Sequence, residues 1–535
     1  MFLRSVLPKT LSHRWVSTST KPWYITTPLF YPNAVPHIGH LYSLVTADLF
    51  ARYNTLKTPS RPVHFVTGSD EHGFKIQKAA LDKGLPPQEF CDTISQQFRR
   101  LAEEADVRST RFVRTSEDKH YAAVEHIWRE LDKKGLIYKG SYSGWYSITD
   151  ECFYTEGQVA YIPEDGETPA RTISKETGAT VEYSNETNYM FRLSRFREAL
   201  LEHYTSNPTS IHPQSHHAHL VTTLQAPLED ISISRPQSRL SWGIPVPGDP
   251  EHTVYVWFDA LIGYLTGIGY PWSDLGTSQG WPVDLQVIGK DIVRFHAVYL
   301  PAVLLALNLP LQRRILAHAH WTSSQKKMSK SLGNTTDPFQ AIEEFGIDSV
   351  RYYLVKVGGR FQDDVDWSHE QLAKHDKELQ AVLGNLFMRI TSPSITARMS
   401  GPIQTEPVGR FSLLMAATRG LPDLVSADMD RMEAANALEK IVDLLRLANK
   451  TVTDAAPWKS TPEVARSTHD VCIEALRVSG ICLQPFIPLV AGKLLDFLGV
   501  SRTERTWSHS QRRSETTPSM LLSLPTNRLF PPKSA

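Results

Sequence analysis

The sequence predicts an α/β fold with a parallel sheet, a β-rich insertion within it and an all-helical region after it. Three observations support this prediction: a strand–helix–strand pattern in residues 23–67, β-like segments separated by turns in residues 138–240, and helical spacing of apolar residues beyond residue 376. The 535 residues suffice for about three to four domains. We therefore expect a multidomain protein built around one parallel sheet.

The parallel sheet is predicted from its first two strands and the helix between them. Residues 23–27 are aromatic or β-branched and residues 63–67 are similar, which is typical of buried strands. Between them, residues 40–52 carry apolar side chains at helical spacing. Ligands of such sheets bind beyond the carboxyl ends of the strands. Residues 36–40 and 68–73 follow these two strands and should border a binding site.

Later segments complete the predicted organisation. Strand-like sequence returns at residues 253–258 and 285–289, residues 293–307 predict a helix, and residues 434–449 predict one of several further helices. The polar tail from about residue 501 is typical of partial disorder. The expected units are 22–137 and 241–316 for the two halves of the sheet domain, 138–240 for the insertion, 317–375 for a connecting region, 376–500 for the helical domain and 501–535 for the tail.

Composition excludes few classes of protein. Hydrophobic residues make up 41% and charged residues 21%, as in ordinary globular proteins. No apolar run approaches the roughly 20 residues of a membrane span, so we expect no membrane partner. The 57 basic residues equal the 57 acidic ones, yet a basic face for nucleic acid can be offset by acid elsewhere. The four cysteines form no CxxC pair, which argues against a disulfide framework or a zinc knuckle.

The first 21 residues differ from the rest of the chain. They are basic and rich in serine and threonine, and the first carboxylate is Asp48. This composition is typical of a transit peptide for the mitochondrial matrix, which we expect in residues 1–21. A disordered basic tail is the alternative. A secretory signal is less favoured because no long apolar segment follows the basic residues.

Two motifs far apart in the chain carry the chemistry. The first, residues 37–40 (His-Ile-Gly-His), places two imidazoles and a glycine at a predicted helix start, where backbone amides favour a phosphate. The second, residues 326–334, interleaves lysines with serines, so that mobile charges can neutralise a phosphate in a transition state. A helix start with one buried histidine and a solvated lysine run are the alternatives. Together the motifs predict attack on the α-phosphate of ATP.

The paired motifs resemble those of the class I aminoacyl-tRNA synthetases. Five further segments resemble the methionine members of that class: Gly68–Gly73, Gly144–Tyr146, Ser241–Pro247, Tyr255–Tyr264 and Ile288–His296. The resemblance extends from about Tyr24 into the helical part. It implies a Rossmann-type catalytic domain with an inserted connective domain, followed by an all-α anticodon-binding domain. It also implies an ATP-dependent methionine–tRNA ligase that forms AMP and pyrophosphate.

For the amino acid, the resemblance implies a pocket formed by Leu29, Tyr31, Asp70, Trp257, Ala260, Tyr264, Ile292 and His296. Asp70 would accept the ammonium group, since a shielded carboxylate binds such a group well. Aromatic walls suit a long, polarizable thioether. Without the neighbouring segments, core packing would be the better account of Trp257 and Tyr264.

For ATP, the resemblance implies His37, Gly39, His40, Gly289, Asp291, Lys327, Ser329 and Lys330, with both histidines and both lysines catalytic. Asp291 would contact the ribose hydroxyls, and Lys330 would have the larger role of the two lysines. Mg²⁺ is expected with ATP, held mostly by phosphates and water.

For tRNA(Met), the resemblance implies that Asn385, Arg389 and Trp458 read the anticodon. An amide, a guanidinium and an indole can hydrogen-bond to and stack on unpaired bases, although ordinary helix packing is an alternative. The other implied partners are L-methionine and ATP, and we expect a monomer. Three other functions are kept as alternatives: a different class I ligase, a tRNA-binding paralogue without catalysis, and a small-molecule nucleotidyltransferase.

The insertion departs from the family pattern in its possible metal ligands. Many members hold zinc on cysteines there, but this region contains only Cys152, and Ser147 stands where a cysteine is common. One thiolate cannot form a tetrahedral sulfur site, so we expect no zinc. Four nearby histidines are expected in a solvated loop: His212, His216, His217 and His219. The insertion is also too short for a large editing domain, so selectivity should come mainly from the synthetic pocket.

Overall fold

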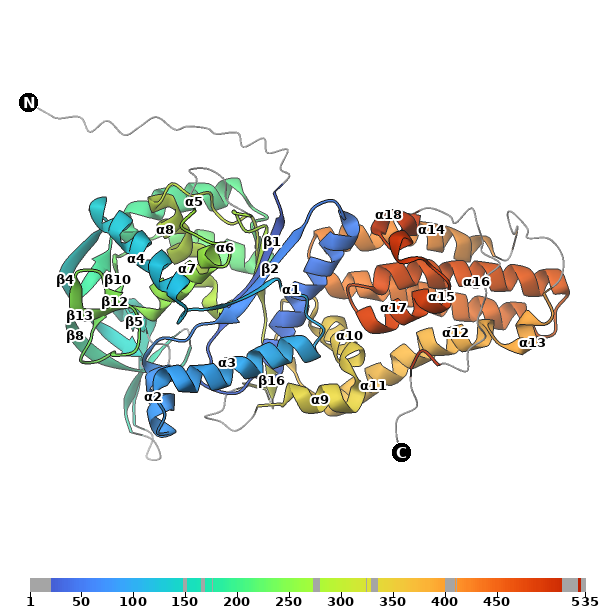
Figure 1. The fold of residues 1–535 in the computed structure, drawn as a ribbon, viewed down its shortest axis with the longest axis horizontal. Coiled ribbons are helices and arrows are strands. Elements are labelled where there is room, and N and C mark those ends of the chain that lie inside the picture. Colours follow the sequence, from blue (N-terminus) through green and yellow to red (C-terminus); the bar gives the residue numbers. More distant parts are fainter. Residues whose placement is uncertain are drawn as a thin grey trace, which may run out of the picture.

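The computed structural model describes residues 21–147, 152–164, 169–175, 177–272, 280–323, 325–328, 335–399, 409, 411–511 and 528–530. The molecule is elongated, with the sheet-containing part at one end and the helical part at the other (Figure 1). Residues 1–20, and with them nearly all of the expected transit peptide, lie outside the described residues, as does most of the polar tail.

The central sheet has six strands, all paired in parallel, in the order β3-β2-β1-β14-β15-β9. The strands are β1 (Trp23–Phe30), β2 (Val63–Ser69), β3 (Arg111–Arg114), β9 (Ile211–His212), β14 (Leu285–Gly289) and β15 (Ile315–His318). The predicted parallel sheet is confirmed, and so are the strands expected at residues 23–27, 63–67 and 285–289. Strand β9 belongs to this sheet although it falls within the range 138–240.

Helix α1 (Ile38–Lys57) connects β1 to β2 and is buried along most of its length. It packs against the sheet on one side and against α10 (Ile347–Gly358) and α18 (Trp507–Gln511) on the other. Figure 1 shows α1 between the sheet and the helical part. This position explains why the helix is apolar around most of its circumference.

One fully buried arginine joins α1 to the helical part. The Arg351 guanidinium lies 2.7 Å from Asp48 Oδ2 on α1. It also donates to the carbonyls of Pro485 and Phe486, at 2.9 and 3.1 Å, between α16 (Pro462–Leu483) and α17 (Pro488–Phe497). Because a buried charge needs such partners, this group holds three parts of the molecule together.

The insertion is a six-stranded antiparallel sheet rather than a set of short pieces. Its two central strands, β4 (Ile137–Ser147) and β8 (Thr180–Phe191), pair along ten residues. The other strands are β5 (Cys152–Tyr154), β6 (Val159–Ile162) and β7 (Arg171–Ser174), with β10 (Ile231–Ser232) paired to β8. The sequence did not predict strands as long as β4 and β8, because one face of such a sheet is exposed and carries polar side chains.

The strand expected at residues 253–258 is half wrong. Residues 253 and 254 do lie in a strand, β13 (Asp249–Val254). Residues 256–258 instead form the start of helix α7 (Val256–Thr266). Almost every residue of α7 is buried. A helix buried on all sides has no polar face, so its sequence cannot be distinguished from a strand by periodicity.

The solvated loop expected around four histidines is also wrong. His212 lies in β9, and the other three lie in α6 (Gln214–Gln225). His217 is buried and contacts the Tyr204 carbonyl oxygen through Nε2 at 3.0 Å. His217 therefore packs inside the protein, whereas His219 on the same helix is exposed.

The remaining elements complete the two parts of the molecule. Two small sheets contain β11 (Ser234–Pro236) and β12 (Pro245–Val246) with β13, and β17 (Lys326–Lys327), β16 (Trp321–Ser323) and β18 (Val365–Asp366). The other helices are α2 (Phe74–Asp82), α3 (Pro87–Glu104), α4 (Asp118–Lys133), α5 (Arg197–Ser206), α8 (Leu300–Ala306), α9 (Pro338–Phe345), α11 (His369–Leu379), α12 (Asn385–Ile390), α13 (Pro393–Thr396), α14 (Ser412–Asp430) and α15 (Ala434–Ala455). The expected helix at residues 293–307 begins as a π-helical turn (Phe295–Tyr299) and continues as α8. Within the described residues, no helix is long and apolar enough to cross a membrane.

Candidate active site

A cleft of about 710 Å³ lies at the carboxyl ends of β1, β2, β14 and β15. It brings together all eight residues predicted for the amino acid and five of those predicted for ATP: Leu29, Tyr31, His37, Gly39, His40, Asp70, Trp257, Ala260, Tyr264, Gly289, Asp291, Ile292 and His296. Met328, from the lysine motif, also lines the cleft. The side chain of Lys327, and all of Ser329 and Lys330, lie outside the described part of the chain.

The two histidines of the first motif are fixed by the start of α1. His37 Nδ1 accepts from the Gly39 amide at 3.0 Å, and His40 Nδ1 accepts from the His37 amide at 3.1 Å. Their rings are in contact, with centroids 3.9 Å apart and planes tilted by 30°. Since Nδ1 is the acceptor in each neutral ring, the proton resides on Nε2. Each imidazole is thus set in the tautomer that donates through Nε2.

Gly39 is needed for this arrangement. A Cβ atom at this position would lie 2.8 Å from His37 Cε1 and 3.0 Å from His37 Nδ1. Any larger residue would therefore displace the ring that caps the helix. The glycine serves the placement of His37 at least as much as the close approach of a nucleotide.

Asp291 and Gly289 lie where β14 ends. Asp291 Oδ1 is 3.0 Å from His320 Nε2, and a Cβ on Gly289 would approach the same carboxylate oxygen to 2.6 Å. The His320 amide is itself held by Asp364 at 2.9 Å. The Asp291 carboxylate is thereby positioned at the edge of the cleft, where it can accept from hydroxyl groups.

The amino-acid side of the cleft contains a fixed tyrosine–histidine pair. Tyr264 and His296 are both buried, and the Tyr264 hydroxyl lies 2.7 Å from His296 Nε2. His296 Nδ1 donates to the Ile292 carbonyl at 2.8 Å, so Nε2 accepts from the tyrosine. Burial lowers the pKa of His296 to about 4. The imidazole is neutral at physiological pH and suits an uncharged side chain.

Aromatic rings form other walls of this side. Trp257 stacks on Phe295 with ring centroids 3.8 Å apart and planes 14° from parallel. Lys75 lies over the Tyr31 ring at 5.5 Å. Leu29 and Ala260 add aliphatic surface. The walls are therefore apolar and polarizable, as a thioether requires.

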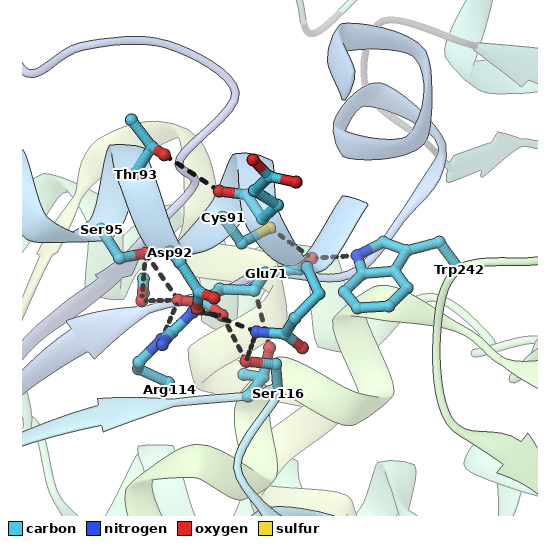
Figure 2. A network of polar contacts seen from close by, with 12 residues as sticks. Glu71, Cys91, Asp92, Thr93, Ser95, Arg114, Ser116 and Trp242 are labelled. Atoms are coloured by element: carbon cyan, nitrogen blue, oxygen red, sulfur yellow. Dashed lines mark hydrogen bonds and ion pairs between the residues drawn. The ribbon is translucent and has the colours of Figure 1, made fainter. Parts of the chain in front are cut away.

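Asp70 follows β2 in a loop that is anchored by its neighbour, Glu71. The buried Glu71 carboxylate accepts from Arg114 at 2.7 and 2.8 Å and from the hydroxyls of Ser69, Ser95 and Ser116 (Figure 2). Burial alone would raise the pKa of Glu71, but these hydrogen bonds outweigh it and lower the pKa. The carboxylate therefore stays ionised and holds the loop rigidly.

Sequence reasoning missed two histidines of the cleft, His318 and His320. His318 Nε2 lies 2.8 Å from Ser43 Oγ on α1, and burial lowers the pKa of His318 to about 4. His318 is the last residue of β15 and His320 follows it closely, but this short strand was not predicted. Recognising that strand would have placed them at the same sheet edge as Gly289.

The residues predicted to read RNA lie in the helical part. Asn385 is exposed at the start of α12, and Arg389 on the same helix contacts Thr453 Oγ1 at 3.0 Å. The Arg389 guanidinium lies 5.8 Å from the Trp458 ring centroid. Arg389 and Trp458 are thus neighbours on one surface, although far apart in the chain.

Possible metal ligands are distributed across the described residues. No group of three or more His, Cys, Asp or Glu side chains among them could hold an ion. The side chain of Cys152 lies outside the described part. Three other cysteines, Cys91, Cys472 and Cys482, are free and buried.

Comparison with known proteins identifies the class. The sequence model described as "tRNA synthetases class I (M)" matches residues 23–391. The chain belongs to the class I tRNA synthetases.

Individual relatives identify the family within that class. A probable mitochondrial methionine–tRNA ligase of Neurospora crassa is 42% identical over 95% of this chain and 84% of its own length. The mitochondrial methionine–tRNA ligase of Mus musculus is 44% identical over 90% of this chain and 86% of its own. The crystal structure of Mycobacterium tuberculosis methionyl-tRNA synthetase bound by methionyl-adenylate matches with a TM-score of 0.88, at 38% identity, over 96% of this chain and 100% of that one. The chain is a member of the methionyl-tRNA synthetase family.

Proposed function

We propose that the cleft binds methionine and ATP side by side, forms methionyl-adenylate, and then transfers methionine to tRNA(Met). The observation that carries this proposal is the continuity of one cleft from the Tyr264–His296 pair to the His37–His40 pair. An amino acid in the first part presents its carboxylate toward a nucleotide in the second.

Methionine recognition divides between a charge and a neutral pocket. The Asp70 carboxylate, held beside the anchored Glu71, accepts the ammonium group. The thioether enters the pocket between Trp257, Tyr264 and His296. Because His296 is neutral, the pocket places no charge against the apolar side chain.

Adenylate formation requires positioning rather than a covalent enzyme intermediate. A methionine carboxylate oxygen attacks the α-phosphorus, the bond to the bridging oxygen breaks, and pyrophosphate leaves with its electron pair. The Nε2–H groups of His37 and His40 donate to phosphate oxygens at the helix start, where the helix dipole adds partial positive charge. The lysines of residues 326–330, Lys327 and Lys330 above all, neutralise the charge on the leaving group.

The second step transfers the activated acyl group. A hydroxyl of the terminal ribose of tRNA attacks the carbonyl carbon of the adenylate, and AMP leaves. The helical part contributes anticodon recognition, with Arg389 and Trp458 presenting a guanidinium and an indole on one surface. We therefore assign catalysis to the sheet-containing part of the molecule and anticodon recognition to the helical part (Figure 1).

The metal and the location extend this proposal. Mg²⁺ would enter with ATP and be held mostly by phosphates and water. The mitochondrial names of the relatives from Neurospora crassa and Mus musculus support a mitochondrial location. We propose the matrix as the compartment, reached through residues 1–21.

Amino-acid-dependent exchange of pyrophosphate into ATP tests the function. Methionine should drive the exchange, while leucine, isoleucine, valine and cysteine should not. Exchange driven by one of these others would assign a different class I ligase. Binding of tRNA without any exchange would point to a paralogue that has lost catalysis.

A further inference from the structure

A buried carboxylate outside the cleft joins the two halves of the amino-acid pocket. Asp259 is fully buried on α7 and does not line the cleft. Its Oδ2 atom lies 2.6 Å from His72 Nδ1, and its Oδ1 atom lies 2.5 Å from His120 Nε2. The three side chains come from three elements separated by long stretches of chain.

The links connect the parts that would recognise methionine. His72 lies two residues after Asp70, in the loop that follows β2. Asp259 lies directly before Ala260, on the helix that also bears Trp257 and Tyr264. One carboxylate therefore ties the ammonium-binding loop to the helix that forms the thioether pocket.

Both nitrogens of His72 and of His120 have a hydrogen-bond partner. Each imidazole donates to Asp259 through one nitrogen, and its other nitrogen lies near a hydroxyl: Tyr121 at 3.2 Å from His72 Nε2 and Thr266 at 2.8 Å from His120 Nδ1. Burial would raise the pKa of Asp259, but the two histidines outweigh it and lower the pKa. A charged acceptor strengthens such bonds, so the group should be rigid.

The loop is anchored on its other side as well. Glu71, between Asp70 and His72, is held by Arg114 and three serines, and its carbonyl accepts from Trp242 Nε1 at 2.6 Å (Figure 2). Glu71 fixes the loop to β3 and α3, whereas His72 fixes it to α7. Of the two anchors, only the Asp259 link spans both halves of the pocket.

We propose that Asp259 is a positioning residue for the amino acid: it sets the distance between the Asp70 loop and α7, and so matches the pocket to methionine. The proposal rests on the function proposed above. Asp259 acts through His72 and its own helix, without touching the substrate.

Asp259→Asn removes this link while keeping the shape of the side chain. An amide has one acceptor oxygen and a donor nitrogen, so it cannot accept from both imidazoles. One donor would face another donor unless an imidazole changes its tautomer. Either response weakens the tie between the loop and the helix.

Asp284→Asn is the matched control. Asp284 is also buried and accepts from Lys21, Arg61 and Arg313, but it lies just before β14, at the opposite end of the strands from the cleft. The same change therefore removes a buried ionised acceptor without reaching the pocket. Both variants should lose some thermal stability.

Pyrophosphate exchange by the full chain provides the readout. Asp259→Asn should raise the KM for methionine about tenfold or more and leave the KM for ATP within about twofold, whereas Asp284→Asn should change neither. Equal methionine KM values in the two variants, or an equal rise for ATP and methionine in Asp259→Asn, would overturn the proposal.

Tyr121→Phe is a milder second variant in case Asp259→Asn does not fold. It removes only the hydroxyl beside His72 Nε2, and it should raise the methionine KM by a smaller factor with the ATP KM unchanged. An unchanged methionine KM in this variant would count against the proposal. Absence of methionine-dependent exchange in the unmodified protein would instead overturn the proposed function, so the two failures are distinguishable.

Discussion

Gly39→Ala should abolish most of the activity while leaving the fold intact. A Cβ at this position would lie 2.8 Å from His37 Cε1, which is closer than side chains tolerate. The His37 ring must then move, and it loses the hydrogen bond from residue 39 and its ring contact with His40. The backbone around α1 need not change, because the His37 side chain lines the cleft and can turn into it.

The stability terms in this variant nearly cancel. Loss of a helix cap costs about 0.5–2 kcal/mol. Replacing glycine by alanine near a helix start stabilises the helix by about 0.5–1 kcal/mol. The free energy of unfolding should therefore stay within about 1.5 kcal/mol of the unmodified protein. A displaced donor in a preorganised phosphate site, by contrast, should lower the rate about 100-fold.

Methionine-dependent pyrophosphate exchange and urea unfolding measure the two effects separately. Gly420→Ala, in α14, is the control, because no atom lies within 4 Å of a Cβ built at Gly420. It should gain about 0.5–1 kcal/mol and keep full activity. An exchange rate for Gly39→Ala close to that of the unmodified protein would refute the role assigned to the His37 ring.

Three further predictions concern other parts of the molecule. Trp458→Ala should lower tRNA charging at least about tenfold and spare pyrophosphate exchange, because base stacking contributes about 1–3 kcal/mol; equal losses in both assays would contradict this. Arg351→Met should lower the free energy of unfolding by about 3–5 kcal/mol in a urea titration, since the change breaks the buried pair with Asp48 and removes the donor to three carbonyls; a loss below about 1 kcal/mol would contradict it. Because burial lowers the pKa of His296 and His318 from 6.5 to about 4, the unfolded chain binds protons that the folded protein does not between these pH values. The contribution of these two histidines to the free energy of unfolding should be fully present above pH 6.5 and should fall by about 2 kcal/mol per histidine between pH 7 and pH 5. In His318→Gln the free energy of unfolding should fall less steeply with pH than in the unmodified protein.

The features that the sequence predicted well are local. The motif at residues 37–40 and the loop at residues 68–73 follow strands whose composition is distinctive. Once two such strands are recognised as parallel, their carboxyl ends must lie at one edge of the sheet. Family resemblance then supplied the amino acid, because segments at residues 255–264 and 288–296 contribute to the same cleft.

The features that were missed depend on contacts between distant residues. Helix α7 was expected to begin as a strand because burial on every side removed its helical pattern. The histidines of α6 were expected in a loop because their spacing fits no helix face with a carboxylate partner, although His217 is buried against Tyr204. Asp259 binds His72 and His120, which precede it by 187 and 139 positions in the chain, and no periodic pattern in a sequence indicates such a pairing.

Pyrophosphate exchange with a panel of amino acids tests the central claim most directly. The full chain should incorporate pyrophosphate into ATP with methionine, and Asp70→Asn should abolish this by removing the charge that accepts the ammonium group. Leucine, isoleucine, valine and cysteine should give no exchange above background. Exchange supported equally by methionine and another of these amino acids, or unaffected by Asp70→Asn, would contradict the account.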